Sequence, residues 1–239
     1  MKNIIVLTSG LSGSSVVTNL LSRAGFWTGD STCEKTDYNT HENSQLVYLN
    51  NLLLKAVDYD ENYSVFASSK KIFDVEKLID TIDLLPFKSF IEKCEQSKPW
   101  VWKDPRLWVT VSFWVQLLEK DSFNVIFVDR SISQRWISEL LRKNVQTFAY
   151  CKKYNCQIEQ LIKNFITNHD LNSCDVLFDE LIEYPENTLL LINQFLGCSL
   201  TKVDLQSVYN KPLYQRVRGA KDLLLATLVY LKNYQTRLK

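Results

Sequence analysis

No stretch of this 239-residue chain approaches the roughly 20 consecutive apolar residues that a membrane-spanning helix needs. The apolar run from Ile4 to Leu7 is too short for a signal-peptide core, and a glycine loop rather than a cleavage site follows it. Lys and Arg number 28 against 27 Asp and Glu, so no excess charge favours nucleic acid or a membrane surface. We therefore expect a cytoplasmic protein with no nucleic-acid or membrane partner, in which any anion site is local.

Residue patterns typical of metal sites and disulfide frameworks are also absent. The six cysteines include no Cys-x-x-Cys pair, and only two histidines exist to join them around a metal. Scattered cysteines of this kind are typical of free thiols in a reducing compartment. The composition never shifts sharply and no internal repeat is visible, so we expect one domain over residues 1–239 that needs no metal.

Short apolar runs rich in β-branched and aromatic residues alternate with segments of helical periodicity. The predicted strands are Asn3 to Thr8, Trp100 to Trp102, Phe123 to Val128 and Asp175 to Phe178. The predicted helices are Ser14 to Gly25, Glu42 to Val57, Val75 to a stop near Pro86, Leu107 to Lys120, Ser131 to Lys143, one or two over Phe148 to Ile166, Pro185 to Gly197, and Lys221 to Leu238. Loops are predicted over Gly25 to Thr40 and Tyr59 to Lys71. This order predicts a three-layer α/β fold, a P-loop-type parallel sheet flanked by helices.

Polar and charged residues follow each predicted strand. They are the loop from Ser9 to Ser15, Lys103 with Arg106, Arg130, and Asp179 with Glu180. Because parallel strands place their carboxyl ends along one edge, where ligands bind in open α/β sheets, we expect these residues to converge there.

The loop from Ser9 to Ser15 has the chemistry of an anion cradle. Gly10 and Gly13 allow backbone amides to turn toward a ligand, the serine hydroxyls add donors, and the next helix adds its positive end. A plain strand-to-helix turn is the alternative. A Walker A loop is disfavoured, since Thr8 stands at its first glycine position and Ser14 at its lysine position.

Ser12, Gly13, Ser14 and Ser15 resemble the 5′-phosphosulfate loop of sulfotransferases that use 3′-phosphoadenosine 5′-phosphosulfate (PAPS). The resemblance implies that residues Gly10 to Ser15 bind the donor. Leu11 departs from the family pattern, because it occupies the place of a usual Lys or Arg.

Arg130, at the end of a predicted strand, and Ser138, in the next helix, resemble the Arg-x7-Ser pattern of the same family. There the two side chains bind the donor's 3′-phosphate, for which Arg supplies a planar fork and Ser a hydroxyl. Taken alone this spacing is common. The segment from Asp175 to Gly197 resembles the family's late strand, acidic-Leu, Pro and Phe-Leu-Gly region, and Arg216, Arg218 and Gly219 faintly resemble its basic glycine loop.

Lys103, Asp104, Pro105 and Arg106 resemble a Lys-Asp-Pro-Arg element of a bacterial branch of this family. Sulfuryl transfer moves negative charge onto the bridging oxygen of the leaving nucleotide, so a nearby cation stabilises the transition state. Lys103 or Arg106 can supply the charge that Leu11 lacks. The alternative is that Asp104 and Arg106 form a purely structural ion pair.

His41 and Glu42 lie just before a leucine-rich helix, where related family members place an acidic or histidine residue facing the acceptor. Either can take a proton from an acceptor hydroxyl. The alternative is a helix start in which Thr40 is the cap and Glu42 complements the helix dipole.

The resemblance implies a sulfotransferase that moves a sulfuryl group from PAPS to a hydroxyl or amine of a small-molecule or glycan acceptor, leaving 3′-phosphoadenosine 5′-phosphate (PAP). Two other functional hypotheses stay open. One is a non-catalytic homologue that binds the nucleotide without turnover, which Leu11 favours. The other is an atypical P-loop kinase, which would need a phosphate-binding lysine that the loop lacks.

Overall fold

The computed structural model describes residues 1–35, 38–60, 66–141 and 147–209, together with positions 224, 227, 228 and 231. Its centre is a four-stranded parallel sheet with the strand order β4-β1-β5-β6. The strands are β1 (Asn3–Leu7), β4 (Val101–Lys103), β5 (Phe123–Asp129) and β6 (Ser173–Leu177). All four predicted strands are confirmed, and β1 lies between β4 and β5.

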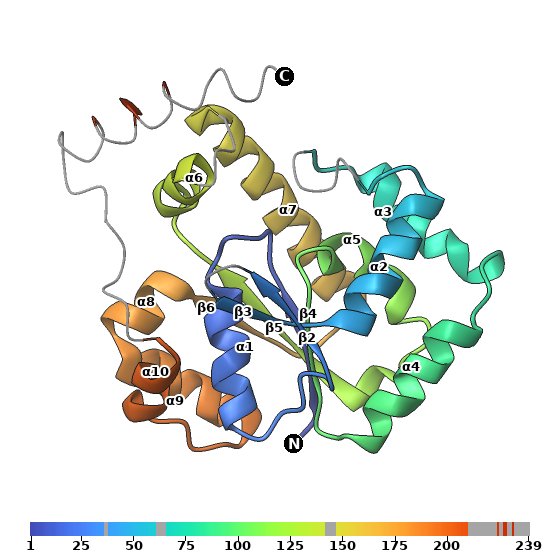
Figure 1. Ribbon diagram of the computed structural model, residues 1–239, viewed down its shortest axis with the longest axis horizontal. Coiled ribbons are helices and arrows are strands. Elements are labelled where there is room, and N and C mark those ends of the chain that lie inside the picture. The colour runs from blue at the N-terminus through green and yellow to red at the C-terminus, as the bar shows by residue number, and fades with distance from the viewer. Residues whose placement is uncertain are drawn as a thin grey trace.

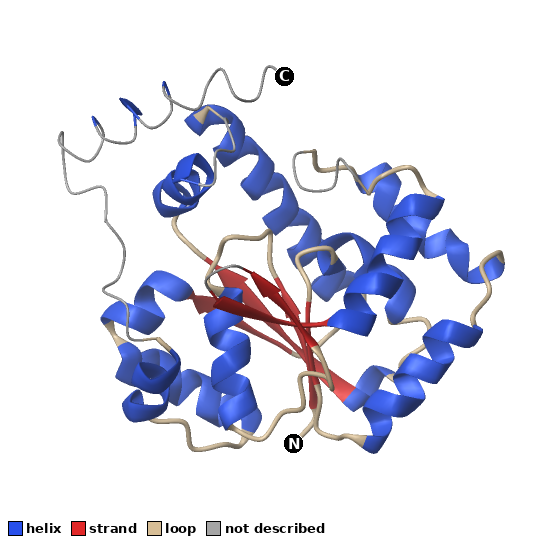
Figure 2. Ribbon diagram, viewed as in Figure 1, coloured by secondary structure: helices blue, strands red, loops and turns tan. Residues whose placement is uncertain are grey.

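Helices cover both faces of the sheet, which confirms the three-layer α/β prediction (Figures 1 and 2). One face carries α1 (Ser14–Arg23), α8 (Phe178–Glu183), α9 (Pro185–Leu196) and α10 (Lys202–Val208). The other carries α2 (Ser44–Ala56), α3 (Ser69–Glu76), α4 (Leu85–Gln96), α5 (Leu107–Trp114) and α7 (Phe148–Asn168). Helix α6 (Ile132–Leu141) follows β5 and contacts α7.

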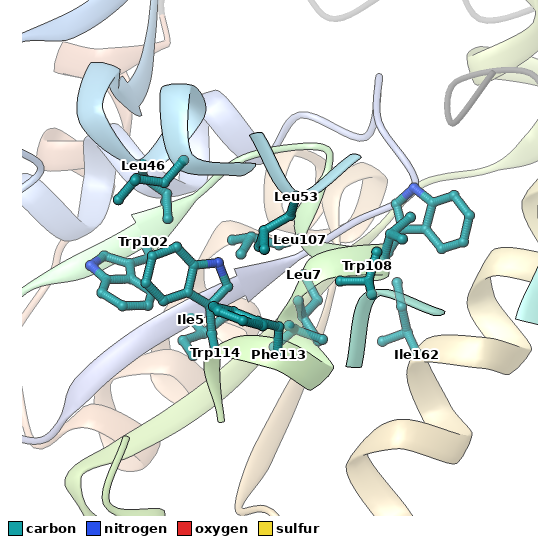
Figure 3. Packing of buried hydrophobic residues seen from close by; sticks show 14 of the residues in the cluster. Ile5, Leu7, Leu46, Leu53, Trp102, Leu107, Trp108, Phe113, Trp114 and Ile162 are labelled. Atoms are coloured by element: carbon teal, nitrogen blue, oxygen red, sulfur yellow. The ribbon is translucent and has the colours of Figure 1, made fainter. Parts of the chain in front are cut away.

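The strands are apolar on both faces because both faces are covered. Along β1, Ile5 points into the cluster beneath α2, α4 and α5, whereas Ile4 and Val6 point into the cluster beneath α1 and α9. Figure 3 shows the first cluster, in which Trp102 of β4 and Trp114 of α5 pack beside Ile5. The Trp102 and Trp114 rings are 4.9 Å apart in an edge-to-face arrangement. These tryptophans stabilise the core.

The predicted loop over Gly25 to Thr40 is wrong in its second half. Strands β2 (Thr32–Lys35) and β3 (Tyr38–Asn43) pair antiparallel there as a separate two-stranded sheet. Their residues are mostly polar, so the hydrophobic alternation that would predict strands is missing. His41 and Glu42 therefore belong to β3 and not to the start of a helix.

Two predicted helix boundaries are also wrong. Pro86 does not end a helix: it lies in the first turn of α4, where its missing N–H would have no intrahelical partner. The segment before it is α3 followed by a 3₁₀ turn, η1 (Lys77–Asp80). Helix α5 ends at Trp114 and not at Lys120, because the amides of Gln116 and Leu117 bond three residues back.

The fourth strand begins at Ser173, and Phe178 already starts α8, a helix that was not predicted. A 3₁₀ turn, η2 (Lys120–Ser122), precedes β5. The segment predicted as one or two helices is the single helix α7. The predicted helix from Lys221 to Leu238 lies almost entirely outside the described residues.

Candidate functional site

The loop between β1 and α1 is folded tightly onto itself. The Thr8 and Ser12 hydroxyl oxygens lie 2.5 Å apart, and the Gly10 amide donates to Thr8 Oγ1 at 3.1 Å. Gly10, Leu11 and Gly13 all have positive φ, at 91°, 52° and 84°. This backbone turns the chain back toward the first turn of α1, where helix amides can receive an anion.

Gly13 is the residue immediately before α1, and only glycine fits there. Its φ of 84° is strained for any residue with a side chain, and a Cβ would overlap the Phe178 ring of α8. No side chain caps this helix end. Ser14 and Ser15 open the helix, so their hydroxyls lie at its positive end.

Arg130 and Ser138, predicted as a pair, are brought together with the loop. The Arg130 guanidinium is 3% exposed, and its Nη1 donates to the Leu11 carbonyl at 3.3 Å and to Ser138 Oγ at 3.4 Å. The Leu11 side chain carries no charge, but the Leu11 carbonyl accepts a hydrogen bond from the Arg130 cation. Arg130 Nη2 also donates to Gln134 at 3.4 Å.

Asp179, in the first turn of α8 just after β6, completes this side of the edge. Its Oδ1 lies 3.9 Å from Arg130 Nε, and its Oδ2 accepts from the Ser131 amide at 2.7 Å. The predicted convergence of strand ends is therefore observed at β1, β5 and the segment after β6.

Lys103 reaches the loop from the β4 side. Its Nζ donates to Ser15 Oγ at 3.1 Å, to the Thr40 carbonyl at 3.4 Å and to Glu42 Oε1 at 2.5 Å. Its side chain is 5% exposed. A buried lysine held between the loop hydroxyl and a carboxylate brings together a cation, an anion cradle and a proton acceptor.

Arg106 is held by Asp104 through its side chain and its backbone. Nη1 and the amide of Arg106 donate to Asp104 Oδ1 at 2.9 and 3.0 Å. The ion pair that we considered as the alternative is therefore present. Of the two candidate cations, Lys103 is the one placed against the loop.

Asn50 of α2 is a residue that the sequence did not single out. Its amide donates to Asp104 at 2.8 Å, and its carbonyl accepts from Thr110 and Trp114, each at 2.8 Å. Asn50 and Asp104 are fully buried. A buried polar residue on an apolar helix face was the signal that could have indicated such a network.

His41 and Glu42 belong to β3 and lie near Lys103 of β4. The helix cap predicted at Thr40 is wrong: Asn43 accepts from the amides of Gln45 and Leu46, while the Thr40 hydroxyl donates to the Cys33 carbonyl. Burial first, and the positive charge of Lys103 second, lower the pKa of His41. Its imidazole is therefore held neutral, the form that can accept a proton.

Arg135 of α6 is a second residue that the sequence did not single out. It donates to Ser9 in the loop, to Asn155 of α7 and to Asp129 of β5. The signal that could have indicated it was a second arginine five residues after Arg130, within the predicted helix from Ser131 to Lys143.

Among the described residues no cluster of His, Cys, Asp and Glu could hold a metal, and no helix is long and apolar enough to cross a membrane. The six cysteines are free, as predicted. Arg216, Arg218 and Gly219 lie outside the described residues.

Comparison with solved structures finds sulfotransferase domains. One, from the curacin biosynthetic pathway, shares 16% sequence identity at a TM-score of 0.54 and covers 88% of this chain and 78% of that chain. Another, from the Synechococcus PCC 7002 olefin synthase, shares 15% identity at a TM-score of 0.55 and covers 94% of this chain and 84% of that chain. The chain therefore has a sulfotransferase-like fold.

No protein-family model and no curated protein matches the sequence. The similarity to solved structures establishes the fold alone.

Proposed function

We propose that this protein is a PAPS-dependent sulfotransferase that transfers a sulfuryl group to a hydroxyl or amine of a small molecule or glycan. The observation that carries the proposal is the position of Lys103, 3.1 Å from Ser15 of the loop and 2.5 Å from Glu42. The fold similarity and the resemblance of residues Ser12 to Ser15 support it.

The donor would lie along the carboxyl edge of the sheet. Residues Gly10 to Ser15 would receive the 5′-phosphosulfate through backbone amides and serine hydroxyls. Arg130 and Ser138 would receive the 3′-phosphate, and their present mutual contact at 3.4 Å places both on one side of the loop. This site needs no metal.

In the proposed reaction, an acceptor oxygen or nitrogen attacks the sulfur in line with the bond to the bridging oxygen. The new bond to sulfur forms as the bond between sulfur and the bridging oxygen breaks, and that electron pair stays on the nucleotide as PAP leaves. Lys103 stabilises the charge that develops on this oxygen. In this role Lys103 replaces the basic residue missing at Leu11.

The acceptor's proton passes to Glu42 or to His41. Glu42 forms an ion pair with Lys103, and its Oε1 lies 2.5 Å from the lysine Nζ. His41 is neutral because its pKa is lowered. Replacing Glu42 by Gln and His41 by Gln, one at a time, identifies the base by the larger loss of turnover.

Calorimetry with PAP and with ATP tests the proposal against the two alternatives. We expect PAP to bind and ATP to bind far more weakly. Binding of ATP without PAP would favour the kinase. If PAP binds, labelled PAPS with an acceptor library measures turnover, and a folded protein that binds PAP without turning over PAPS would be the non-catalytic homologue that Leu11 suggests.

A further inference from the structure

Arg135 is a buried cation that belongs neither to the loop from Ser9 to Ser15 nor to the pair of Arg130 and Ser138. Its side chain is 2% exposed. Nη1 donates to Ser9 Oγ and, at 2.6 Å, to Asn155 Oδ1, while Nη2 donates to Asp129. Its Nε is buried and has no hydrogen-bond partner in the described part of the chain.

Ser9, the first residue of the loop from Ser9 to Ser15, is fixed by these contacts. Its hydroxyl donates to Asn155 Oδ1 at 2.7 Å, so its oxygen is left to accept from Arg135. The beginning of the loop is thereby tied to α6 and α7. A hydroxyl whose donor and acceptor roles are both set cannot rotate freely.

Cations hold the loop from both sides. From the β4 side, Lys103 donates to Ser15 at the end of the loop. From the β5 side, Arg130 donates to the Leu11 carbonyl and Arg135 donates to Ser9. The loop itself contains no basic residue. Its positive environment therefore comes from neighbouring strands and helices.

Arg135 forms an ion pair with Asp129, and Arg130 is a second cation nearby. Burial raises the pKa of Asp129, and the positive charge of Arg135 opposes that rise. Burial is the main cause that lowers the pKa of Arg135, and the nearby positive charge of Arg130 lowers it further. An anion in the loop would relieve the repulsion between these two guanidinium groups.

We propose that Arg135 is a positioning residue for the donor's anionic group. It holds Ser9 so that the loop keeps the conformation that presents its amides, and it adds positive charge from the β5 side. The identity of the anion rests on the proposed function, whereas the dependence of anion binding on Arg135 and Ser9 does not.

A double-mutant cycle measured by PAP calorimetry tests this role. Ser9→Ala and Arg135→Met are each expected to raise the Kd for PAP about tenfold, since each removes a charge-assisted hydrogen bond. Because both act through one contact, the double variant should be no more than about twofold weaker than Arg135→Met. Arg135→Lys, which keeps the charge and one donor, should recover part of the affinity. Lys202→Met removes an exposed cation of α10 and should leave the Kd unchanged.

Folding is followed separately, because Arg135→Met leaves Asp129 without its partner. The variant Arg135→Met with Asp129→Asn removes that isolated carboxylate, and we expect it to melt higher than Arg135→Met while binding PAP as weakly. Wild-type affinity for PAP in folded Arg135→Met, or additive effects of Ser9→Ala and Arg135→Met in the cycle, would overturn the proposal. If the wild type binds ATP and not PAP, the proposed donor is wrong, and the same cycle measured with ATP decides the role of Arg135.

Discussion

At the scale of single residues, Lys103 lies between the loop that joins β1 to α1 and the side chains of β3. Its ammonium group has three donors, and Ser15, the Thr40 carbonyl and Glu42 are all within 3.4 Å. A buried ammonium requires such partners, because an isolated charge in the interior is costly. A donor phosphosulfate arriving at Ser15 would meet this charge directly.

Replacing Lys103 by Met should lower the turnover of labelled PAPS by about 100- to 1000-fold, as the loss of one group that stabilises transition-state charge does in other enzymes. Arg106→Met should lower it less, since Arg106 is bound to Asp104. Lys93→Met, which breaks an exposed ion pair with Asp30, is the matched control and should keep full turnover. Normal turnover in folded Lys103→Met would contradict the assignment.

His41 makes the stability of the protein depend on pH. Its pKa in the folded state is lowered from 6.5, mainly by burial, so the unfolded chain binds the proton more readily. Stability should therefore fall as the pH drops from 6.5 toward the lower folded-state pKa. Urea unfolding at several pH values should show a smaller fall for His41→Gln, and an unchanged pH dependence would show that another group is responsible.

At the scale of elements, the turn from β1 into α1 depends on close packing against α8. Gly13 has a left-handed backbone and lies where a Cβ would overlap Phe178. Gly25, just after α1, has a similar φ of 93° but faces open space. The two glycines separate backbone strain from overlap.

Gly13→Ala should therefore destabilise the protein more than Gly25→Ala does. Gly25→Ala should cost about 1 kcal/mol or somewhat more, the strain of a left-handed residue. Gly13→Ala adds the displacement of Phe178 and should also weaken PAP binding, because the loop must move. Denaturant unfolding of both variants measures the difference, and equal losses of stability would show that the loop tolerates a Cβ.

Elements with strong apolar periodicity could be predicted from the sequence, and those without it could not. The strand β5 is apolar except for Asn124 and its last residue, Asp129, and is nearly as predicted. Strands β2 and β3 are polar, and their pairing with each other has no signature in either segment. Pro86 permits both a helix stop and a helix start, and only the packing of α4 decides between them.

At the scale of the whole molecule, the parallel sheet assembles a site from distant segments. The resemblance to the Arg-x7-Ser pattern predicted Arg130 with Ser138, and the expected convergence of parallel strand ends predicted that Lys103 would approach the loop. The partners of Asn50 and Arg135 are contributed by other helices and strands. No local pattern records such contacts, so the sequence carries only weak signals for these residues: a polar residue on an apolar helix face, and a second arginine soon after Arg130.

The proposed donor site is tested most directly by the affinities of PAP and of adenosine 5′-monophosphate, which lacks the 3′-phosphate. We expect the wild type to prefer PAP strongly, and Arg130→Ala to lose about 1.5 to 3 kcal/mol of PAP binding while binding of the monophosphate is little affected. Equal affinity for the two nucleotides in the wild type, or an undiminished preference for PAP in Arg130→Ala, would contradict the proposed donor site.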